Sequence, residues 1–148
     1  MRNLFLSAVI TLFAFSVSSA QTSKMDVSIL PDNAQKFIEQ HFSSETVKKV
    51  EKEDGILNMD KSEMYEVHFA NGVKLDFNEA GEVTEIESRK DAKLPMKAIP
   101  MEILDYVKNN YKNAHVMSWE MDNDEQEVEL SDGTDLEFDL KGKFLKED

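Results

Sequence analysis

The sequence predicts an α+β protein built from a tandem repeat. Each copy is a helix followed by a four-stranded antiparallel meander, with the helix on one face of the sheet. Two observations predict this fold. Apolar residues recur first at helical and then at alternating spacing, and the whole pattern occurs twice within 148 residues. We assign residues 21–93 to the first repeat and residues 94–148 to the second.

Apolar, aromatic and glycine positions align between the repeats at two offsets. Over the helical part the offset is 69 residues, which aligns Phe37 with Tyr106. Over the later strands it is 61 residues, which aligns Gly72 with Gly133. The change in offset falls in the polar stretch after Glu53, where a hairpin loop can change length at little entropic cost.

Each repeat opens with an amphipathic helix. Side chains spaced three and four residues apart fall on one stripe of a helix. Pro31 lies near the start of the first helix, where its missing N–H costs no hydrogen bond. The stripe comprises Ala34, Phe37, Ile38, His41 and Phe42 in the first repeat, and Ile103, Tyr106, Val107, Asn110 and Tyr111 in the second.

The rest of each repeat predicts strands, because apolar and polar residues alternate. Asn71-Gly72 and Asp132-Gly133 predict hairpin turns, since both turn residues must accept positive φ. Alternation leaves one sheet face apolar, under the helix, and the other polar and open. We expect strands near 46–53, 65–69, 73–77 and 83–86, and in the second repeat near 115–122, on both sides of Asp132-Gly133 through Leu140, and at 144–145.

Residues 1–20 have the layout of a secretory signal peptide: a positive start at Arg2, an uncharged apolar run, and small residues before Gln21. We expect cleavage before Gln21 and export to the periplasm, with secretion from the cell as an alternative. A retained membrane anchor also stays open, although the run from Leu4 to Val17 is shorter than the ~20 residues that span a bilayer.

The composition narrows the choice of partners. The chain carries 17 Lys+Arg against 30 Asp+Glu, a net charge of −13, and no cysteine. Phosphate groups repel such a chain, so nucleic acid, and membrane after signal cleavage, are not expected partners. Cations and basic protein surfaces are compatible with it, and so is an acidic surface that only maintains solubility. Without cysteine, thiol catalysis and cysteine-ligated metal sites are excluded.

The helix pattern Leu-Pro…Ala…Phe-Ile…His-Phe, the hairpin Tyr-Glu-Val-His-Phe-Ala-Asn-Gly and the turn Phe-Asn-Glu-Ala-Gly-Glu resemble the PepSY-like, β-lactamase-inhibitor-like proteins that gut Bacteroidota export. The resemblance covers about residues 28–146. It implies a periplasmic location, a fold like that of the β-lactamase inhibitory protein, and an inhibitory or protein-binding role. One line of this family is described as calcium-regulated. The resemblance supplies no residue-level binding motif.

Carboxylates gather on the predicted open face of the second repeat. Period-two counting places Glu127, Glu129, Asp135, Glu137 and Asp139 there, with Ser118, Glu120 and Asp122 on the neighbouring strand. We predict that Glu127, Glu129, Glu137 and Asp139 contact a partner, most simply a basic protein surface that this field attracts. The matching face of the first repeat is mixed and carries Glu66, His68, Lys74 and Asp76.

Calcium is the one cofactor that the sequence suggests. Calcium prefers oxygen ligands, and the loop at Asp122, Asp124 and Glu125 offers several in a short stretch. The loop is not an EF-hand, because the twelve-residue spacing and its glycine are absent. A solvated acidic turn is the alternative. No histidine pair has the spacing of a zinc motif.

Trp119 alternates with Met117 and Met121 along one predicted strand. We expect Trp119 to face the core. The alternative is a partly exposed Met/Trp patch in which Trp119 would contact a partner, so it is a further candidate partner-binding residue.

No catalytic signature occurs: the chain lacks a GxSxG nucleophile motif and a glycine-rich phosphate loop. We therefore predict an exported, non-enzymatic module that binds another protein through its open sheet face and inhibits that protein if it covers an active site. A calcium-responsive periplasmic binding protein is the alternative, and an uncharacterised hydrolase is a third. The sequence leaves the partner and the oligomeric state open.

Overall fold

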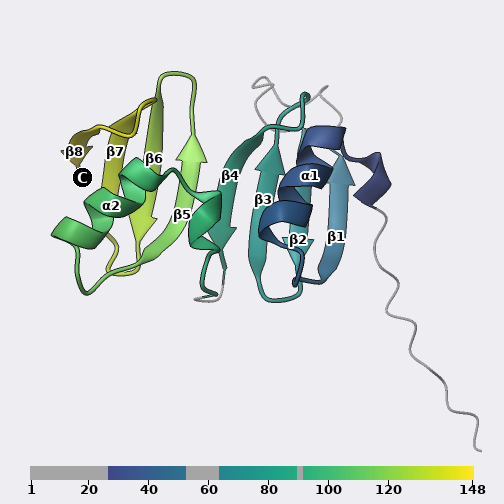
Figure 1. Cartoon of the computed structure of the whole chain (residues 1–148), viewed down its shortest axis with the longest axis horizontal. Helices are drawn as coiled ribbons and strands as arrows, with labels where there is room; N and C mark the ends of the chain where they lie inside the picture. Colours follow the sequence, from purple (N-terminus) through teal and green to yellow (C-terminus); the bar gives the residue numbers. More distant parts are fainter. Residues whose placement is uncertain (1–26, 53–63, 90–91) are drawn as a thin grey trace, which may run out of the picture.

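The computed structural model describes residues 27–52, 64–89 and 92–148. Within these residues the fold is α+β, as predicted, with two α-helices, two short 3-10 helices and eight strands (Figure 1). The predicted signal peptide lies outside the described residues. The elements are η1 (Val27–Ile29), α1 (Asp32–His41), β1 (Val47–Lys52), β2 (Tyr65–Phe69), β3 (Val73–Phe77), β4 (Val83–Ser88), η2 (Met96–Ala98), α2 (Met101–Asn110), β5 (Val116–Met121), β6 (Glu125–Leu130), β7 (Asp135–Asp139) and β8 (Phe144–Glu147).

All eight strands form one antiparallel sheet, in which spatial order follows chain order. The sequence predicts two meanders, and the structure joins them edge to edge because β4 pairs with β5. At this junction Ile86 lies opposite Trp119. The pairing also covers one strand edge of each meander, and an uncovered edge is a template for pairing with other chains.

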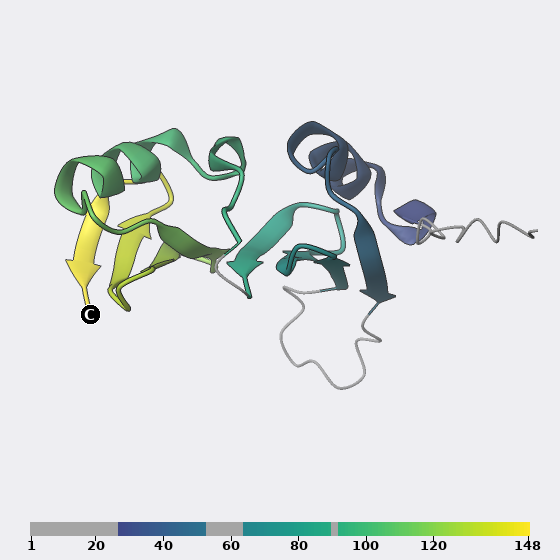
Figure 2. The same cartoon turned by 90° about the horizontal axis from the view of Figure 1, so that it is seen from below.

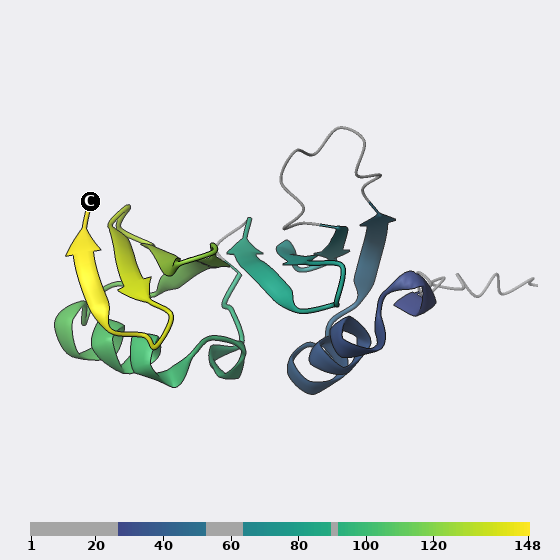
Figure 3. The same cartoon turned by 90° about the horizontal axis from the view of Figure 1, so that it is seen from above.

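The two helices pack on the sheet through matching ring contacts. Phe37 of α1 meets Phe77 of β3 edge-on, with ring centroids 6.0 Å apart. Tyr106 of α2 meets Phe138 of β7 in the same manner at 5.4 Å. These are pairs that the two sequence offsets align. Figures 2 and 3 show α1 and α2 on the same side of the sheet.

Irregularities of the sheet recur in both repeats. The register of β1 shifts between Val47 and Lys49, and β5 shifts at the equivalent positions. The pairings of β3 with β4 and of β7 with β8 both shift beside the buried Phe77 and Phe138. Because the bulges are equivalent, the polar faces of the two repeats can be compared residue by residue.

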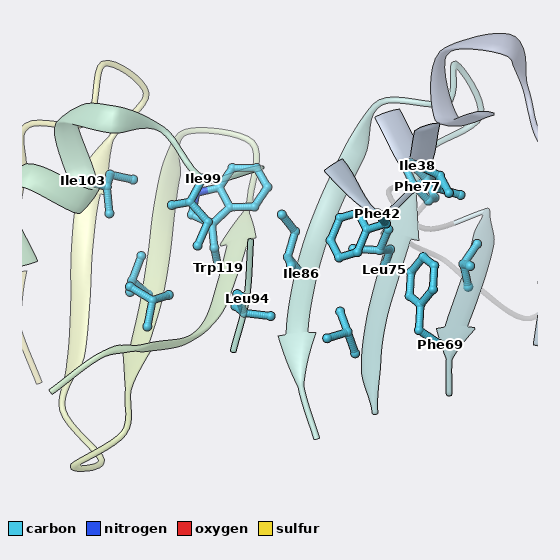
Figure 4. Close-up of a cluster of buried hydrophobic side chains, with 14 of the residues drawn as sticks. Ile38, Phe42, Phe69, Leu75, Phe77, Ile86, Leu94, Ile99, Ile103 and Trp119 are labelled. Atoms are coloured by element: carbon cyan, nitrogen blue, oxygen red, sulfur yellow. The ribbon is translucent and has the colours of Figure 1, made fainter. Parts of the chain in front are cut away.

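One apolar core runs across the junction of the repeats. Ile86 and Trp119 are 0% and 2% exposed, and Leu94 and Ile99 of the segment before α2 are buried. Figure 4 shows these four side chains where the two halves of the sheet meet. The indole Nε1 of Trp119 donates a hydrogen bond to Oε1 of the buried Gln126 (3.0 Å), so the polar group of this core residue is satisfied.

The predicted hairpin turns have the expected chemistry. Gly72 and Gly133 have φ angles of 98° and 84°, in the left-handed region that favours glycine. The side-chain oxygens of Asn71 and Asp132 accept hydrogen bonds from backbone N–H groups two residues later, at 3.0 and 3.2 Å. These contacts close each turn locally.

One predicted strand position is wrong. Leu140 lies beyond the end of β7 and is 55% exposed. The strand ends because Oδ1 of Asp139 accepts hydrogen bonds from the N–H groups of Lys141 (2.8 Å) and Lys143 (2.9 Å), which bends the chain into a turn.

Within residues 27–52, 64–89 and 92–148, neither helix combines the length and the apolar character that crossing a bilayer requires.

Gly81, in the turn between β3 and β4, generates a prediction about stability. Its φ is +76°, and an added Cβ would lie 2.7 Å from Cβ of Pro31 and 2.9 Å from N of Ala34. We predict that Gly81→Ala lowers the free energy of unfolding by ~3 kcal/mol in urea denaturation, because a left-handed penalty of ~1–2 kcal/mol adds to overpacking.

Gly133→Ala is the matched control for this variant. Gly133 has a φ of +84°, and no atom lies within 4 Å of a Cβ placed there. The free energy of unfolding of this variant should therefore fall only by the cost of the left-handed conformation, ~1–2 kcal/mol. Equal losses in the two variants would contradict the close packing of Gly81 against the start of α1.

Candidate functional site

A row of carboxylates crosses the sheet on the face opposite the buried apolar residues. Strand register places Glu51 opposite Glu66, Glu66 opposite Asp76, and Asp76 opposite Glu85. The row continues across the junction of the repeats. We define the carboxylate row as one residue from each strand from β1 to β7: Glu51, Glu66, Asp76, Glu85, Glu120, Glu127 and Glu137.

A second row runs beside the first, offset by two residues along each strand, and it contains both acidic and basic side chains. Its basic members lie over β1 to β3, whereas from β4 to β7 neither row contains a lysine or arginine. We call the two rows together the acidic face. The mixed row consists of Lys49, His68, Lys74, Glu87, Ser118, Glu129 and Asp135.

The acidic face is crowded with like charge over the second repeat. The exposed Glu127 has Glu120 and Glu137 as its cross-strand neighbours. Partial burial raises the pKa of Glu127, and the nearby carboxylates of Asp135 and Glu137 raise it further. Directly opposed like charges destabilise a sheet, so a bound cation or basic group would relieve this repulsion.

The first repeat contains a buried ionic cluster. Lys74 and Asp76 are 8% and 1% exposed. Lys74 Nζ donates a hydrogen bond to Glu85 Oε2 at 2.8 Å and lies 2.7 Å from Asp76 Oδ2. Glu87 Oε2 is 3.8 Å from the same ammonium group. One ammonium group is therefore surrounded by three carboxyl groups, of which that of Asp76 is the most deeply buried.

Burial and proximity shift the pKa values of this cluster. Burial raises the pKa of Asp76 to about 8, its contact with Glu85 adds to the effect, and Lys74 opposes it. Burial also acts to raise the pKa of Glu85, but its contacts with Asp76 and Lys74 outweigh burial and lower that pKa. Asp76 is consequently the carboxyl group that retains its proton near neutral pH.

The structure separates the predicted partner-binding residues into three kinds. Glu127 and Glu129 are exposed on the acidic face, and Glu137 is half-buried beside Lys146, whose Nζ lies 2.6 Å from Glu137 Oε1. Asp139 holds the turn after β7, as described above, and backbone N–H groups, that of Lys143 foremost, lower its pKa. Trp119 is buried in the core, so the alternative of an exposed Met/Trp patch that includes it is wrong.

The loop predicted to bind calcium connects β5 and β6. Oδ1 of Asp122 accepts hydrogen bonds from the backbone N–H and side-chain amide of Asn123, at 2.6 and 3.0 Å. Within the described parts of the chain, Asp122, Asp124 and Glu125 do not form a group of converging ligand atoms. Calcium binding at this loop stays a prediction.

Sequence reasoning missed one residue that the structure brings to a potential ligand cluster. Glu51 of β1 joins Glu66 and His68 of β2, and one ligand atom from each lies within 4.8 Å of the others. The signal that could have revealed it is the alignment at offset 69 with Glu120, which sequence analysis does place on the open face.

A groove of about 920 Å³ lies where the two repeats meet. Apolar side chains form part of its walls, and Gly81, Thr84 and amide and carboxylate side chains line the rest; the apolar residues are Phe37, Val83, Trp119, Met121 and Leu140. Its two carboxylates, Glu82 and Asp122, are exposed. The acidic face is therefore the stronger candidate, because its charged groups are aligned by strand pairing.

The buried ionic cluster generates a prediction about pH. A carboxyl group with a raised pKa in the folded state contributes stability that is fully present below the pKa of ~4 in the unfolded chain and lost as pH rises to about 8. Asp76→Asn imitates the protonated acid at every pH. We predict that the free energy of unfolding of the native chain falls by at least ~1 kcal/mol relative to that of Asp76→Asn as pH rises from 5 to 8. Urea denaturation across this range would measure it, and parallel pH profiles would contradict it.

Solved structures of bacterial proteins resemble this chain. One is described as a putative calcium-regulated periplasmic protein from Bacteroides thetaiotaomicron; it is 38% identical, with a TM-score of 0.74, and the match covers 84% of this chain and 94% of that one. A putative periplasmic protein from Bacteroides vulgatus is 34% identical, with a TM-score of 0.72 and the same coverage. Another, of unknown function, is 34% identical with a TM-score of 0.69, covering 84% and 95%.

A family model gives the same result along the sequence. The model described as "Putative beta-lactamase-inhibitor-like, PepSY-like" matches residues 16–61 and 63–146, so it spans both repeats. No curated protein matches the chain. These descriptions name an inhibitor-like family and periplasmic proteins, one of them calcium-regulated and one of unknown function, and none names an enzyme. With its fold, its two repeats and its solved relatives in agreement, the chain belongs to the PepSY-like, β-lactamase-inhibitor-like family and is a periplasmic protein.

Proposed function

We propose that the protein is a non-enzymatic binding module whose acidic face binds a basic surface of another protein. The observation that carries this proposal is the carboxylate row, which strand pairing aligns across seven strands. If the bound surface of the partner contains an active site, the module inhibits that partner by covering it.

The second repeat is the strongest part of this surface. From β4 to β7 the acidic face has no basic residue in either row, and Glu120, Glu127 and Glu129 are exposed there. The raised pKa of Glu127 reflects partial burial and then repulsion from neighbouring acids. Lysine or arginine side chains of a partner would remove that repulsion and would also speed the encounter electrostatically.

Charge reversal on this surface tests the proposal. We predict that Glu127→Lys combined with Glu129→Lys reduces capture of the partner from a periplasmic extract at least tenfold, because both side chains lie at the centre of the exposed carboxylates. Immobilised protein and quantitative mass spectrometry of the captured material would measure this.

The control places the same charge change elsewhere. Glu102→Lys combined with Asp105→Lys alters two exposed acids of α2, the helix whose Tyr106 packs on the apolar face of the sheet, so net charge and long-range steering are matched. This variant should retain capture. Equal loss of capture in both double variants would show that net charge, not the acidic face, accounts for binding.

Calcium responsiveness is the second candidate function. It is favoured by the solved relative at 38% identity that is described as a putative calcium-regulated protein. Oxygen ligands suit calcium, and both the loop at Asp122 and Asp124 and the face at Glu127 and Glu129 supply carboxylates. A calcium ion held by these groups would change the affinity of the acidic face for its partner.

Thermal melting with calcium tests the second candidate. We predict that millimolar CaCl2 raises the Tm, since a ligand at one hundred times its Kd stabilises a protein by about 2.7 kcal/mol. Asp122→Asn with Asp124→Asn removes the effect if the loop holds the ion, whereas Glu127→Gln with Glu129→Gln removes it if the face does. A Tm that does not change with calcium would reject this function.

A further inference from the structure

The cluster of Glu51, Glu66 and His68 has a chemistry that differs from the rest of the acidic face. It is the one group of three or more metal-ligating side chains whose ligand atoms converge within the described parts of the chain. We propose that these three residues form a binding site for a divalent transition-metal ion, with zinc as its representative.

Strand pairing places the three ligands on one rigid surface. Glu51 of β1 lies directly opposite Glu66 of β2, and His68 is two residues further along β2 on the same face. Because all three are anchored on paired strands, assembling the site requires rotation of side chains and no movement of the backbone.

The separation of His68 Nε2 from Glu51 Oε2 is close to that between two ligands of one zinc ion, whereas the contact of His68 with Glu66 has to open. His68 Nε2 contacts Glu66 Oε1 and lies 3.8 Å from Glu51 Oε2. Nitrogen and oxygen ligands about 2.0–2.1 Å from a tetrahedral zinc ion stand roughly 3.4 Å from one another. Small rotations of the Glu66 and Glu51 side chains would therefore open the cluster around an ion.

The ligand types select the class of metal. Calcium and magnesium prefer oxygen ligands throughout, whereas an imidazole nitrogen suits zinc, copper, nickel and iron. One histidine with two carboxylates is a mixed set that leaves a fourth position free. A water molecule or a group of a partner protein can complete that coordination.

Neighbouring lysines do not occupy the site. Lys49 Nζ lies 2.6 Å from Oε1 of Glu51, which leaves Oε2, the oxygen that faces His68, available to a metal. Lys74, opposite His68 in register, directs its ammonium group away to Asp76 and Glu85, at 2.7 and 2.8 Å. The position between His68 and the two glutamates is thus bordered by ligand atoms, and the ammonium group of Lys49 contacts only the Glu51 oxygen that is not Oε2.

Solvent access is also suitable. The side chains of Glu51, Glu66 and His68 are 43%, 26% and 23% exposed, so an ion can enter while part of each ligand is shielded by its neighbours.

The second repeat provides an internal comparison. Its pairing places Glu120 opposite Glu127 and Ser118 opposite Glu129, in the same geometry as the first repeat. The positions that correspond to Glu51, Glu66 and His68 are therefore Glu120, Glu127 and Glu129. This second set offers oxygen ligands only, so the imidazole of His68 is what distinguishes the first cluster.

Isothermal titration of the full chain with ZnCl2 tests the proposal. We expect one high-affinity zinc ion per chain. His68→Gln and Glu51→Gln should each weaken zinc binding at least tenfold, since loss of even a supporting residue around a metal costs 10–100-fold. His115→Gln is the control: His115 is exposed and lies immediately before β5, outside the cluster, so zinc binding should be unchanged.

A gain-of-function variant tests the site without relying on a loss of zinc binding, which misfolding could also cause. Glu129→His gives the second repeat the ligand set of the first, and it should raise the stoichiometry from one zinc ion to two. The proposal is overturned if the native chain does not bind zinc, if His68→Gln binds it as tightly as the native chain, or if calcium competes equally for the same site.

Discussion

The antiparallel pairing of β4 with β5 is the contact on which the rest of the structure depends. On the apolar side it sets Ile86 against Trp119, and on the polar side it sets Glu85 opposite Glu120. A unit the size of one repeat is only marginally stable by surface-to-volume scaling, so a shared core across this junction adds stability. The same pairing makes one continuous carboxylate row out of two short ones.

That row has an energetic cost that the core must offset. Like charges directly opposite one another destabilise a sheet, and the row contains such pairs on neighbouring strands. In the first repeat Lys74 offsets part of this repulsion by its contacts with Asp76 and Glu85. Over β5 to β7 neither row contains a lysine, although Lys146 of β8 contacts Glu137, so the surface around Glu120, Glu127 and Glu129 is the part most suited to an external cation or a basic partner.

The two repeats share a scaffold and differ in the chemistry of one face. Phe37 against Phe77 and Tyr106 against Phe138 are the same helix-to-sheet contact made twice. On the polar face, by contrast, His68 and Lys74 of the first repeat correspond to Glu129 and Asp135 of the second. A duplicated fold has therefore kept its packing and varied its surface, so that one half offers mixed nitrogen and oxygen ligands and the other half oxygen ligands only.

Helices, hairpin turns and the repeat are determined by the sequence alone, because spacing of apolar residues and turn glycines such as Gly72 act over a few neighbouring positions. The exposed acids Glu127 and Glu129 follow from the same alternation. Only the tertiary structure decided that β4 pairs with β5, that Asp139 holds a turn and that Glu51 meets His68. These facts depend on edge pairing, register and bulges between strands distant in sequence, which no local periodicity specifies.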